Sequence, residues 1–350
     1  MIKKAIARVV EGKSLSEGEM SDAMAEIFAG RASPAQIGAL LIALRMKGES
    51  LAEITGAAKA MRAAALPVPT KARSLGQSLV DIVGTGGDAT GTFNVSTTTA
   101  FVVAGAGLPV AKHGNRAVSS SCGSADLIEA LGIPLDIPPQ LTGQCIDQVG
   151  IGFLFAPVLH RAMGNAIGPR REIGLRTIFN LLGPLTNPAD ANVLVVGVYD
   201  PGLCPLLAET LDRLGAECAY VIHGEGGYDE ATVTGNTWIS YMAGGSLCQS
   251  VVTPEDVGLC RAKGQDLRGG SPQSCKDFTL EILHGAPGPK RDMVLLNAAC
   301  ALKAAGQASD LKEGVALAAA SIDTGAALAK LEALREMVQR NHCQDQEHAS

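Results

Sequence analysis

The chain has 350 residues, enough for one large domain or two smaller ones around a sizeable core. Hydrophobic residues make up 47% of the sequence and aromatic residues only 3%, so small side chains favour helices packed closely on a sheet. The formal net charge of −6, with no long run of Lys and Arg, argues against a nucleic-acid partner.

The nine cysteines are scattered, without a CxxC pair and without zinc-ligand spacing to His. An odd number does not suit a closed disulfide framework, so they indicate small apolar side chains in a reducing cytoplasm. The amino-terminal apolar runs are too short for a signal peptide. No run of about 18 uncharged apolar residues predicts a transmembrane helix. We therefore expect a cytoplasmic protein that does not contact a membrane.

The first 66 residues are predicted to be helical. Three serines each stand three residues before a Glu or Gln, the pattern of a capping box at a helix start: Ser16 with Glu19, Ser33 with Gln36, and Ser50 with Glu53. Pro34 follows Ser33 at the first helical position, where proline is favoured. The stretch LPVP at 66–69 then interrupts the helical pattern and marks a boundary.

Beyond this boundary, short β-type runs alternate with helical segments such as 124–131 and 201–214. The predicted strands are Leu79–Val83, Leu108–Ala111, Val193–Tyr199 and Ala219–His223. This alternation predicts an α/β fold with a mainly parallel central sheet flanked by helices. The expected organisation is a small all-helical N-terminal domain at 1–70, which helices within 165–190 are candidates to join. A larger α/β domain follows at 71–340, and then an unstructured tail at 341–350.

The stretch DIVGTGGDATGTFNVST, residues 81–97, has four glycines between Gly84 and Gly91 and one carboxylate, Asp88. GTGGDA matches the dinucleotide fingerprint formally, but no acid follows at the distance needed to bind a ribose. A P-loop is excluded because no Gly-Lys-Ser/Thr follows. A tight strand-to-helix turn without a ligand stays open from the loop alone.

No Asp or Glu occurs between Asp88 and Asp126, a span that contains Lys112 and Arg116. Within it, NVSTTT opens one helix beside hydroxyl groups, and KHGNRAVSSSCGSAD leads into another, capped around Ser124. Helix N-termini offer unpaired N–H groups to anions. Two of them, with a lysine and an arginine, predict two neighbouring anion sites and a ligand with phosphate at both ends.

A carboxylate beside phosphates is tolerated where it accepts hydrogen bonds from a sugar hydroxyl or from metal-bound water, which gives Asp88 a function. Asp229 and Glu230 stand side by side in HGEGGYDEATVTG, after the Ala219–His223 strand. Acids at the carboxyl end of a strand are suitable oxygen ligands for Mg²⁺. The residues alone therefore indicate a sugar carrying two phosphate groups, bound with magnesium.

These motifs resemble the anthranilate phosphoribosyltransferase family. The resemblance rests on GTGGD at Gly84–Asp88, TFNVST at Thr92–Thr97, KHGNRAVSS at Lys112–Ser120 and the Asp229-Glu230 pair. It continues through RTIFNLLGPLTNP at Arg176–Pro188 and RDMVLLNAACAL at Arg291–Leu302. It implies transfer of phosphoribose from 5-phosphoribosyl 1-diphosphate to the amine of anthranilate, in tryptophan biosynthesis. It also implies a homodimer formed through the helical domain, with the site between the two domains.

The resemblance implies the following site residues. The ribosyl diphosphate would contact Gly84, Thr85, Gly86, Gly87, Asp88, Thr92, Asn94, Ser96, Thr97, Lys112 and Ser124. Anthranilate would contact Gly84, Asn115, His160 and Arg170. Ser96, Asp229 and Glu230 would hold two magnesium ions per subunit, and Lys112, Asp88 and Arg170 would carry the catalytic roles.

Two alternatives stay open at this point. A pyrimidine nucleoside phosphorylase shares the fold by resemblance and also cleaves at an anomeric carbon, but KHGNR and the paired acids suit a diphosphate substrate better. A non-catalytic relative that binds nucleic acid is expected to be basic and to lack the metal acids, whereas this chain is acidic and has them.

Overall fold

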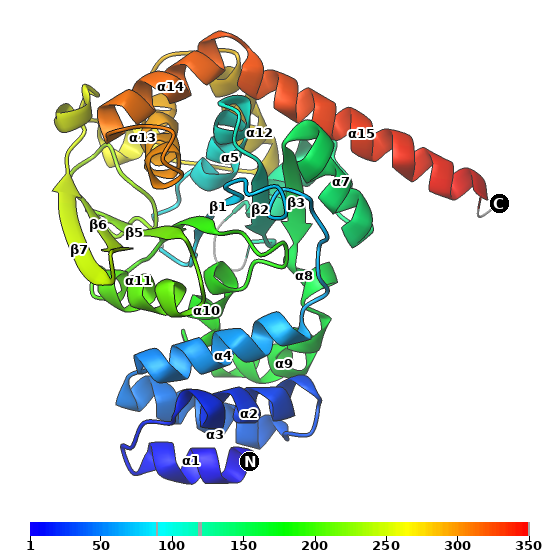
Figure 1. The fold of residues 1–350 in the computed structure, drawn as a ribbon, viewed down its shortest axis with the longest axis vertical. Helices are drawn as coiled ribbons and strands as arrows, with labels where there is room; N and C mark the ends of the chain where they lie inside the picture. The colour runs from blue at the N-terminus through cyan, green and yellow to red at the C-terminus, as the bar shows by residue number, and fades with distance from the viewer. Residues whose placement is uncertain (89, 118–120, 349–350) are drawn as a thin grey trace.

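A computed structural model describes residues 1–88, 90–117 and 121–348 (Figure 1). Its centre is a seven-stranded sheet in the order β3-β2-β1-β4-β5-β6-β7. The first five strands pair in parallel, and β6 and β7 form an antiparallel hairpin at one edge. The strands are β1 (Val80–Gly84), β2 (Val110–Gly114), β3 (Ile151–Phe155), β4 (Val193–Gly197), β5 (Cys218–Gly224), β6 (Thr237–Ala243) and β7 (Ser246–Val252).

The two faces of the sheet are covered by different helices (Figure 1). Side chains alternate along a strand, so in β4 Val193 and Val195 belong to one hydrophobic core and Leu194 and Val196 to the other. The first core is closed by α5 (Val95–Gly105), α6 (Ser124–Ala130), α7 (Pro139–Val149), α12 (Pro272–Leu283), α13 (Pro289–Ala304), α14 (Leu311–Asp323) and α15 (Ala326–His348). The parallel sheet covered on both faces by helices confirms the predicted fold class.

The second core joins the sheet to the amino-terminal helices. These are α1 (Ile2–Val10), α2 (Glu17–Phe28), α3 (Pro34–Lys47) and α4 (Leu51–Ala64). α9 (Gly164–Ile173) packs on α2 and α3, whereas α10 (Phe179–Leu182) contacts α4 and α11 (Leu203–Arg213) packs between α4 and the sheet. The capping boxes of Ser16, Ser33 and Ser50 are all formed, as predicted. Glu53, the acid of the third box, is fully buried and pairs with Lys47 at 2.8 Å. The boundaries of the two domains stay a prediction.

Three elements of the sheet were not predicted: β3, β6 and β7. The prediction of an unstructured tail from 341 is wrong as far as His348, because α15 continues to that residue. The physical reason is local: the segment contains no glycine or proline to end the helix. Residues 349–350 of that prediction lie outside the described part of the chain, as do residues 118–120 of the KHGNRAVSS motif.

No single helix in the described ranges is long and apolar enough to cross a membrane. Only α14 and α15 taken together reach the required length and composition, and they are bent by 58°. Ala318 and Ile322 of α14 and Leu331 and Leu334 of α15 are buried in the first core, which accounts for their apolar character.

Candidate active site

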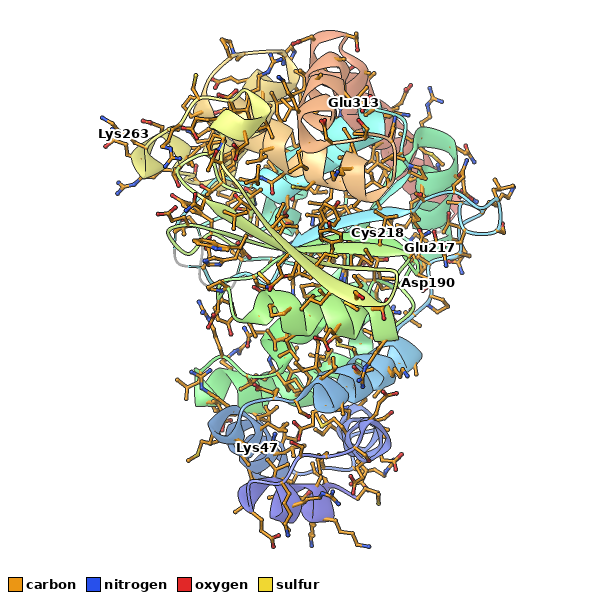
Figure 2. The ribbon with its side chains drawn as sticks, turned by 60° about the vertical axis from the view of Figure 1, so that its left-hand side comes forward. Lys47, Asp190, Glu217, Cys218, Lys263 and Glu313 are labelled. Atoms are coloured by element: carbon orange, nitrogen blue, oxygen red, sulfur yellow. The ribbon has the colours of Figure 1, made fainter. Side chains whose placement is uncertain are left out.

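The predicted site residues follow the carboxyl ends of neighbouring parallel strands. β2 and β3 lie on one side of β1, and β4 and β5 lie on the other. The strand order therefore reverses between β1 and β4, the place where open α/β sheets bind ligands. The glycine loop follows β1, the Asn115 loop follows β2, and the Asp229 loop follows β5. Asp190, Glu217 and Cys218 gather instead at the amino ends of β4 and β5 (Figure 2).

Two glycines make room for Asp229 where these loops meet. Gly84 and Gly197 pair at the ends of β1 and β4. A Cβ at Gly84 would stand 2.3 Å from the Asp229 Oδ2 atom, and a Cβ at Gly197 only 1.5 Å from the Asp229 carbonyl oxygen. Both strands must therefore end in glycine for the acid loop to fold over the sheet.

Three carboxylates meet in this space. Asp88, Asp229 and Glu230 each offer one oxygen, and these oxygens all lie within 4.8 Å of one another. The Gly86 amide donates to Asp229 Oδ2 at 2.6 Å. Burial and the neighbouring Asp88 charge raise the pKa of Asp229 to about 7. Burial and the Asp229 charge raise the pKa of Glu230 well above its usual range.

The residues of this cluster fit a divalent cation. The buried Glu230 Oε2 atom has no hydrogen-bond partner among the described residues. Three carboxylates this close repel one another, and a cation among them would relieve the repulsion. Carboxylate oxygens are also the ligands that Mg²⁺ prefers. The Ser96 backbone, in the first turn of α5, favours the ionised form of Glu230, so the predicted metal residue Ser96 adjoins this cluster.

Lys112 lies in β2 and is only 2% exposed. Its ammonium group donates to the His113 carbonyl at 2.6 Å. Burial lowers the pKa of Lys112, whereas the charges of Asp81, Glu230 and Asp229 favour its protonated form. The lysine is thus a buried cation beside the acid cluster.

Asp81, to which the sequence assigned no function, supports this strand end. Its fully buried carboxylate accepts from the His113 amide at 3.1 Å and from Asn187 Nδ2 at 2.8 Å. Burial raises the pKa of Asp81. In the sequence, Asp81 is marked only by its position as the first residue of the DIVGTGGD motif.

The predicted anthranilate residues lie on three separate segments. His160 follows α8 (Ala156–Leu159) and its ring contacts that of His113 at a tilt of 50°, with ring centroids 5.1 Å apart. Burial lowers the pKa of both rings, to about 3 for His113 and about 4 for His160. Arg170 lies on α9, where its guanidinium is 5.1 Å from the Phe179 ring centroid. Asn115 is exposed and its Oδ1 atom accepts from the next backbone amide.

Arg170 has no carboxylate partner within the described residues, and burial lowers its pKa. Its guanidinium is therefore available to an anionic ligand. No hydrogen bond or ion pair within the described ranges joins Arg170 to Asn115 or His160.

Several buried polar atoms at this edge have no hydrogen-bond partner among the described residues. They are Thr85 Oγ1, Asn94 Oδ1, Thr97 Oγ1, His113 Nε2, both ring nitrogens of His160 and Glu230 Oε2. For His160 the Thr186 backbone lies close enough to favour the protonated ring slightly, without regular hydrogen-bond geometry. Buried polar atoms are nearly always partnered, so their concentration here indicates a binding site for a polar ligand.

The remaining predicted residues are placed around this group. Thr92 bridges to Arg268 before α5, and Asn94 is the N-cap residue of that helix. Ser124 is the first residue of α6, with Gly123 at the N-cap in place of the predicted serine. Gly87 lies in the glycine loop with a positive φ of 70°.

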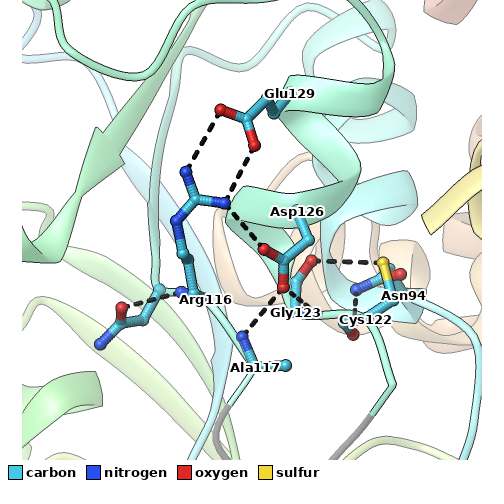
Figure 3. A network of polar contacts seen from close by, with 8 residues as sticks. Asn94, Arg116, Ala117, Cys122, Gly123, Asp126 and Glu129 are labelled. Carbon is cyan, nitrogen blue, oxygen red and sulfur yellow. Dashed lines mark hydrogen bonds and ion pairs between the residues drawn. The ribbon is translucent and has the colours of Figure 1, made fainter. Parts of the chain in front are cut away.

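The interpretation of Arg116 as a ligand-binding cation is wrong. Its guanidinium contacts Asp126 at 3.0 Å and forks onto Glu129 at 2.9 and 3.2 Å (Figure 3). Arg116 is exposed and these two acids neutralise it. The sequence did not indicate this pairing, because both acids belong to the next helix, α6.

Arg176 takes a place beside the glycine loop instead. Its guanidinium lies 3.8 Å from the Tyr199 ring centroid and 3.4 Å from where a Cβ of Gly87 would be. Its charge partly offsets the raised pKa of Asp229. From the sequence alone, this residue is interpreted as a surface or domain-bridging cation.

The chain matches the glycosyl transferase family, helical bundle domain, over residues 3–65 and the glycosyl transferase family, a/b domain, over residues 76–328. It is 56% identical to anthranilate phosphoribosyltransferase of Moorella thermoacetica over 334 residues, covering 95% of this chain and 97% of that protein. The crystal structure of the Thermus thermophilus enzyme is similar with a TM-score of 0.90 and 44% identity, over 96% of this chain and 99% of that one. The Saccharomyces cerevisiae enzyme in complex with PRPP and Mg is similar with a TM-score of 0.87 and 27% identity, over 97% and 98%. The chain belongs to the anthranilate phosphoribosyltransferase family.

Proposed function

We propose that this chain transfers the 5-phosphoribosyl group from 5-phosphoribosyl 1-diphosphate to the amine of anthranilate, releasing diphosphate, in tryptophan biosynthesis. The observation that carries the proposal is the position of the acid cluster. Asp88, Asp229 and Glu230 share one space beside the buried cation Lys112, at the strand-order reversal where an α/β sheet binds its ligand.

The ribosyl diphosphate lies along the glycine loop and the start of α5. Thr85 and Thr97 have buried hydroxyl groups without partners among the described residues, and these would bond phosphate or ribose oxygens. The α5 N-terminus adds unpaired backbone N–H groups. Gly84, Gly86 and Gly87 let the backbone approach the donor closely.

Bond cleavage at the anomeric carbon leaves negative charge on the departing diphosphate. Lys112 is already buried beside the acids, and a fixed cation stabilises such charge without reorganising. Mg²⁺ held by Asp88, Asp229, Glu230 and Ser96 would supply further charge neutralisation to the diphosphate. We propose two ions per subunit, since three carboxylates and a serine offer more ligand oxygens than one Mg²⁺ takes from protein.

Anthranilate binds on the other side of the donor. Arg170 has no carboxylate partner in the part of the chain described, and its planar guanidinium matches the anthranilate carboxylate. Asn115 and His160 complete the acceptor site. The depressed pKa of His160 keeps its ring neutral at pH 7, so the ring does not repel the arginine.

We further propose a cytoplasmic homodimer formed through the helical domain. Val10 at the end of α1 and Met46 near the end of α3 are 70% and 83% exposed, and Ile167 of α9 is 48% exposed. Exposed apolar side chains gathered on one part of a molecule indicate an interface. Light scattering tests this proposal, with Met46→Glu expected to shift the mass toward that of a monomer.

The reaction is tested by following the loss of anthranilate fluorescence with the ribosyl diphosphate, with and without Mg²⁺. Magnesium-dependent loss with one diphosphate released per anthranilate consumed supports the proposal. Phosphorolysis of thymidine or uridine in place of this reaction would assign the chain to the nucleoside phosphorylases. A gel shift tests binding to DNA, which the net charge of −6 disfavours.

A further inference from the structure

Two cysteines lie together beside the substrate loop. Cys122 directly precedes α6 and Cys275 lies in the first turns of α12, and these two helices pack against each other. Both belong to one hydrophobic core, where Cys122 is 7% and Cys275 1% exposed. The two thiols interact with one another and are not covalently linked.

The Cys122 segment is joined to the donor site through Asn94. Asn94 Nδ2 donates to the Cys122 carbonyl at 3.1 Å (Figure 3), whereas its Oδ1 atom has no partner within the described residues. The position of this side chain therefore depends on where the Cys122 carbonyl lies. Asp126 holds the same segment from the other side, accepting from the Gly123 and Ala117 amides at 2.9 and 3.0 Å.

The surroundings differ for the two thiols in a way that suits stepwise oxidation. Cys275 is near the N-terminus of α12, where the helix dipole favours a thiolate. The hydrogen bond from Cys122 lowers the pKa of Cys275, and the charge of Lys290 adds to this effect. The same hydrogen bond raises the pKa of Cys122. Cys275 is therefore the nucleophile and Cys122 the thiol that reacts second.

We propose that Cys122 and Cys275 form a reversible redox site, in which a disulfide ties the segment before α6 to α12 and weakens binding of the ribosyl diphosphate. The oxidant is hydrogen peroxide. The Cys275 thiolate attacks the peroxide O–O bond and becomes a sulfenic acid, releasing one water after protonation. The Cys122 sulfur then attacks the sulfenic sulfur, loses its proton and releases a second water, so two thiols are oxidised and one peroxide is reduced.

We expect disulfide formation to shift the segment that carries Cys122. The sulfurs have to approach to about 2.05 Å, which breaks the contacts of Cys122 Sγ with the Gly123 carbonyl at 3.6 Å and of Cys275 Sγ with the Gly270 carbonyl at 3.7 Å. We expect the Cys122 carbonyl to shift with its sulfur and Asn94 to lose its hydrogen bond to that carbonyl. The inference goes beyond the transfer reaction, but its kinetic effect depends on the proposed role of Asn94 in donor binding.

The test treats the purified full-length protein with hydrogen peroxide and then maps cross-linked peptides by mass spectrometry. We expect a Cys122–Cys275 linkage that dithiothreitol reverses. The KM for the ribosyl diphosphate should rise roughly tenfold, the effect of losing about one hydrogen bond to the substrate. Cys275→Ser should keep the reduced-state KM and become insensitive to peroxide. Cys260→Ser, at an exposed thiol, is the matched control and should respond as the unmodified protein does.

A folded, peroxide-treated protein without this linkage overturns the proposal, and so does a complete linkage with an unchanged KM. Peroxide inhibition that persists in Cys275→Ser also overturns it. The linkage is measured without any substrate, so a chain that proved to catalyse another reaction would still give a clear answer on the disulfide.

Discussion

The two glycines that end β1 and β4 contact different parts of Asp229, so substitution of each to alanine is expected to have a different effect. At Gly84 the new Cβ meets the far end of the Asp229 side chain, 2.3 Å from Oδ2, whereas at Gly197 it meets the Asp229 carbonyl oxygen at 1.5 Å. A side-chain end moves at low cost, but a backbone carbonyl held within a loop does not. Gly84→Ala is therefore expected to fold and Gly197→Ala to be severely destabilised.

The sizes of the two effects follow from what is displaced. In Gly84→Ala, Asp229 Oδ2 gives up the Gly86 amide that it accepts at 2.6 Å. Losing one charge-assisted hydrogen bond costs about 1.5–3 kcal/mol, or roughly 10- to 100-fold in kcat/KM if the carboxylate must stay in place for turnover. Gly197→Ala forces the loop away from the sheet, and such overpacking costs about 3 kcal/mol of folding stability or more.

The assay pairs thermal unfolding with magnesium-dependent anthranilate turnover. Gly18→Ala is the matched control, because it lies in α2 with nothing within 4 Å of a new Cβ, and it should leave turnover unchanged. Wild-type turnover in folded Gly84→Ala would refute the argument that the glycine exists to position Asp229. Equal stability of Gly197→Ala and the control would show that the loop does not press on β4 as described.

Other predictions follow from single groups. Asp229 has a pKa raised from 3.8 to about 7 in the folded, metal-free protein, so its contribution to stability is full below about pH 4 and is lost as the pH rises through 7. Since Mg²⁺ needs the ionised carboxylate, Mg²⁺ should raise the melting temperature more at pH 8 than at pH 5.5, and Asp229→Asn should reduce this difference. Arg170→Ala should raise the KM for anthranilate roughly 10- to 100-fold, with only partial rescue by Arg170→Lys; an unchanged KM would contradict the assignment. Arg62→Ala removes hydrogen bonds from α4 to the Leu185 carbonyl at 2.8 Å and the Leu214 carbonyl at 3.1 Å. It should lower stability by about 2–4 kcal/mol in urea unfolding, and a loss below 0.5 kcal/mol would show that the two parts are held together elsewhere.

Features set by neighbouring residues were predictable from the sequence. The capping boxes of Ser16, Ser33 and Ser50 depend on residues three apart and formed as expected. The strands β1, β2, β4 and β5 were anticipated because each is an apolar run beside a glycine or polar turn. β6 was missed because Ser240 interrupts its apolar run, and β7 because it is largely exposed.

Features set by distant residues were not predictable in the same way. Arg116 was interpreted as a ligand cation from its neighbours in sequence, but it is paired with Asp126 and Glu129 one helix later. The contact between the His113 and His160 rings joins two segments that no local pattern relates. The sequence predicted which residue types form the site. It did not predict which of them contact one another, because those contacts depend on the order of the strands.

A carboxylate within a phosphate-binding loop is explained by this geometry. Asp88 alone in a glycine loop would repel the donor, and adding Asp229 and Glu230 within 4.8 Å makes the repulsion larger. Burial and repulsion among these carboxylates also raise the pKa values of Asp229 and Glu230. A divalent cation reverses it, because it neutralises the acids and presents positive charge to the diphosphate. We therefore expect the loop to bind the diphosphate only when the metal is present. Lys112, buried near the acids, and Arg176, beside the glycine loop, supply positive charge that does not depend on the metal.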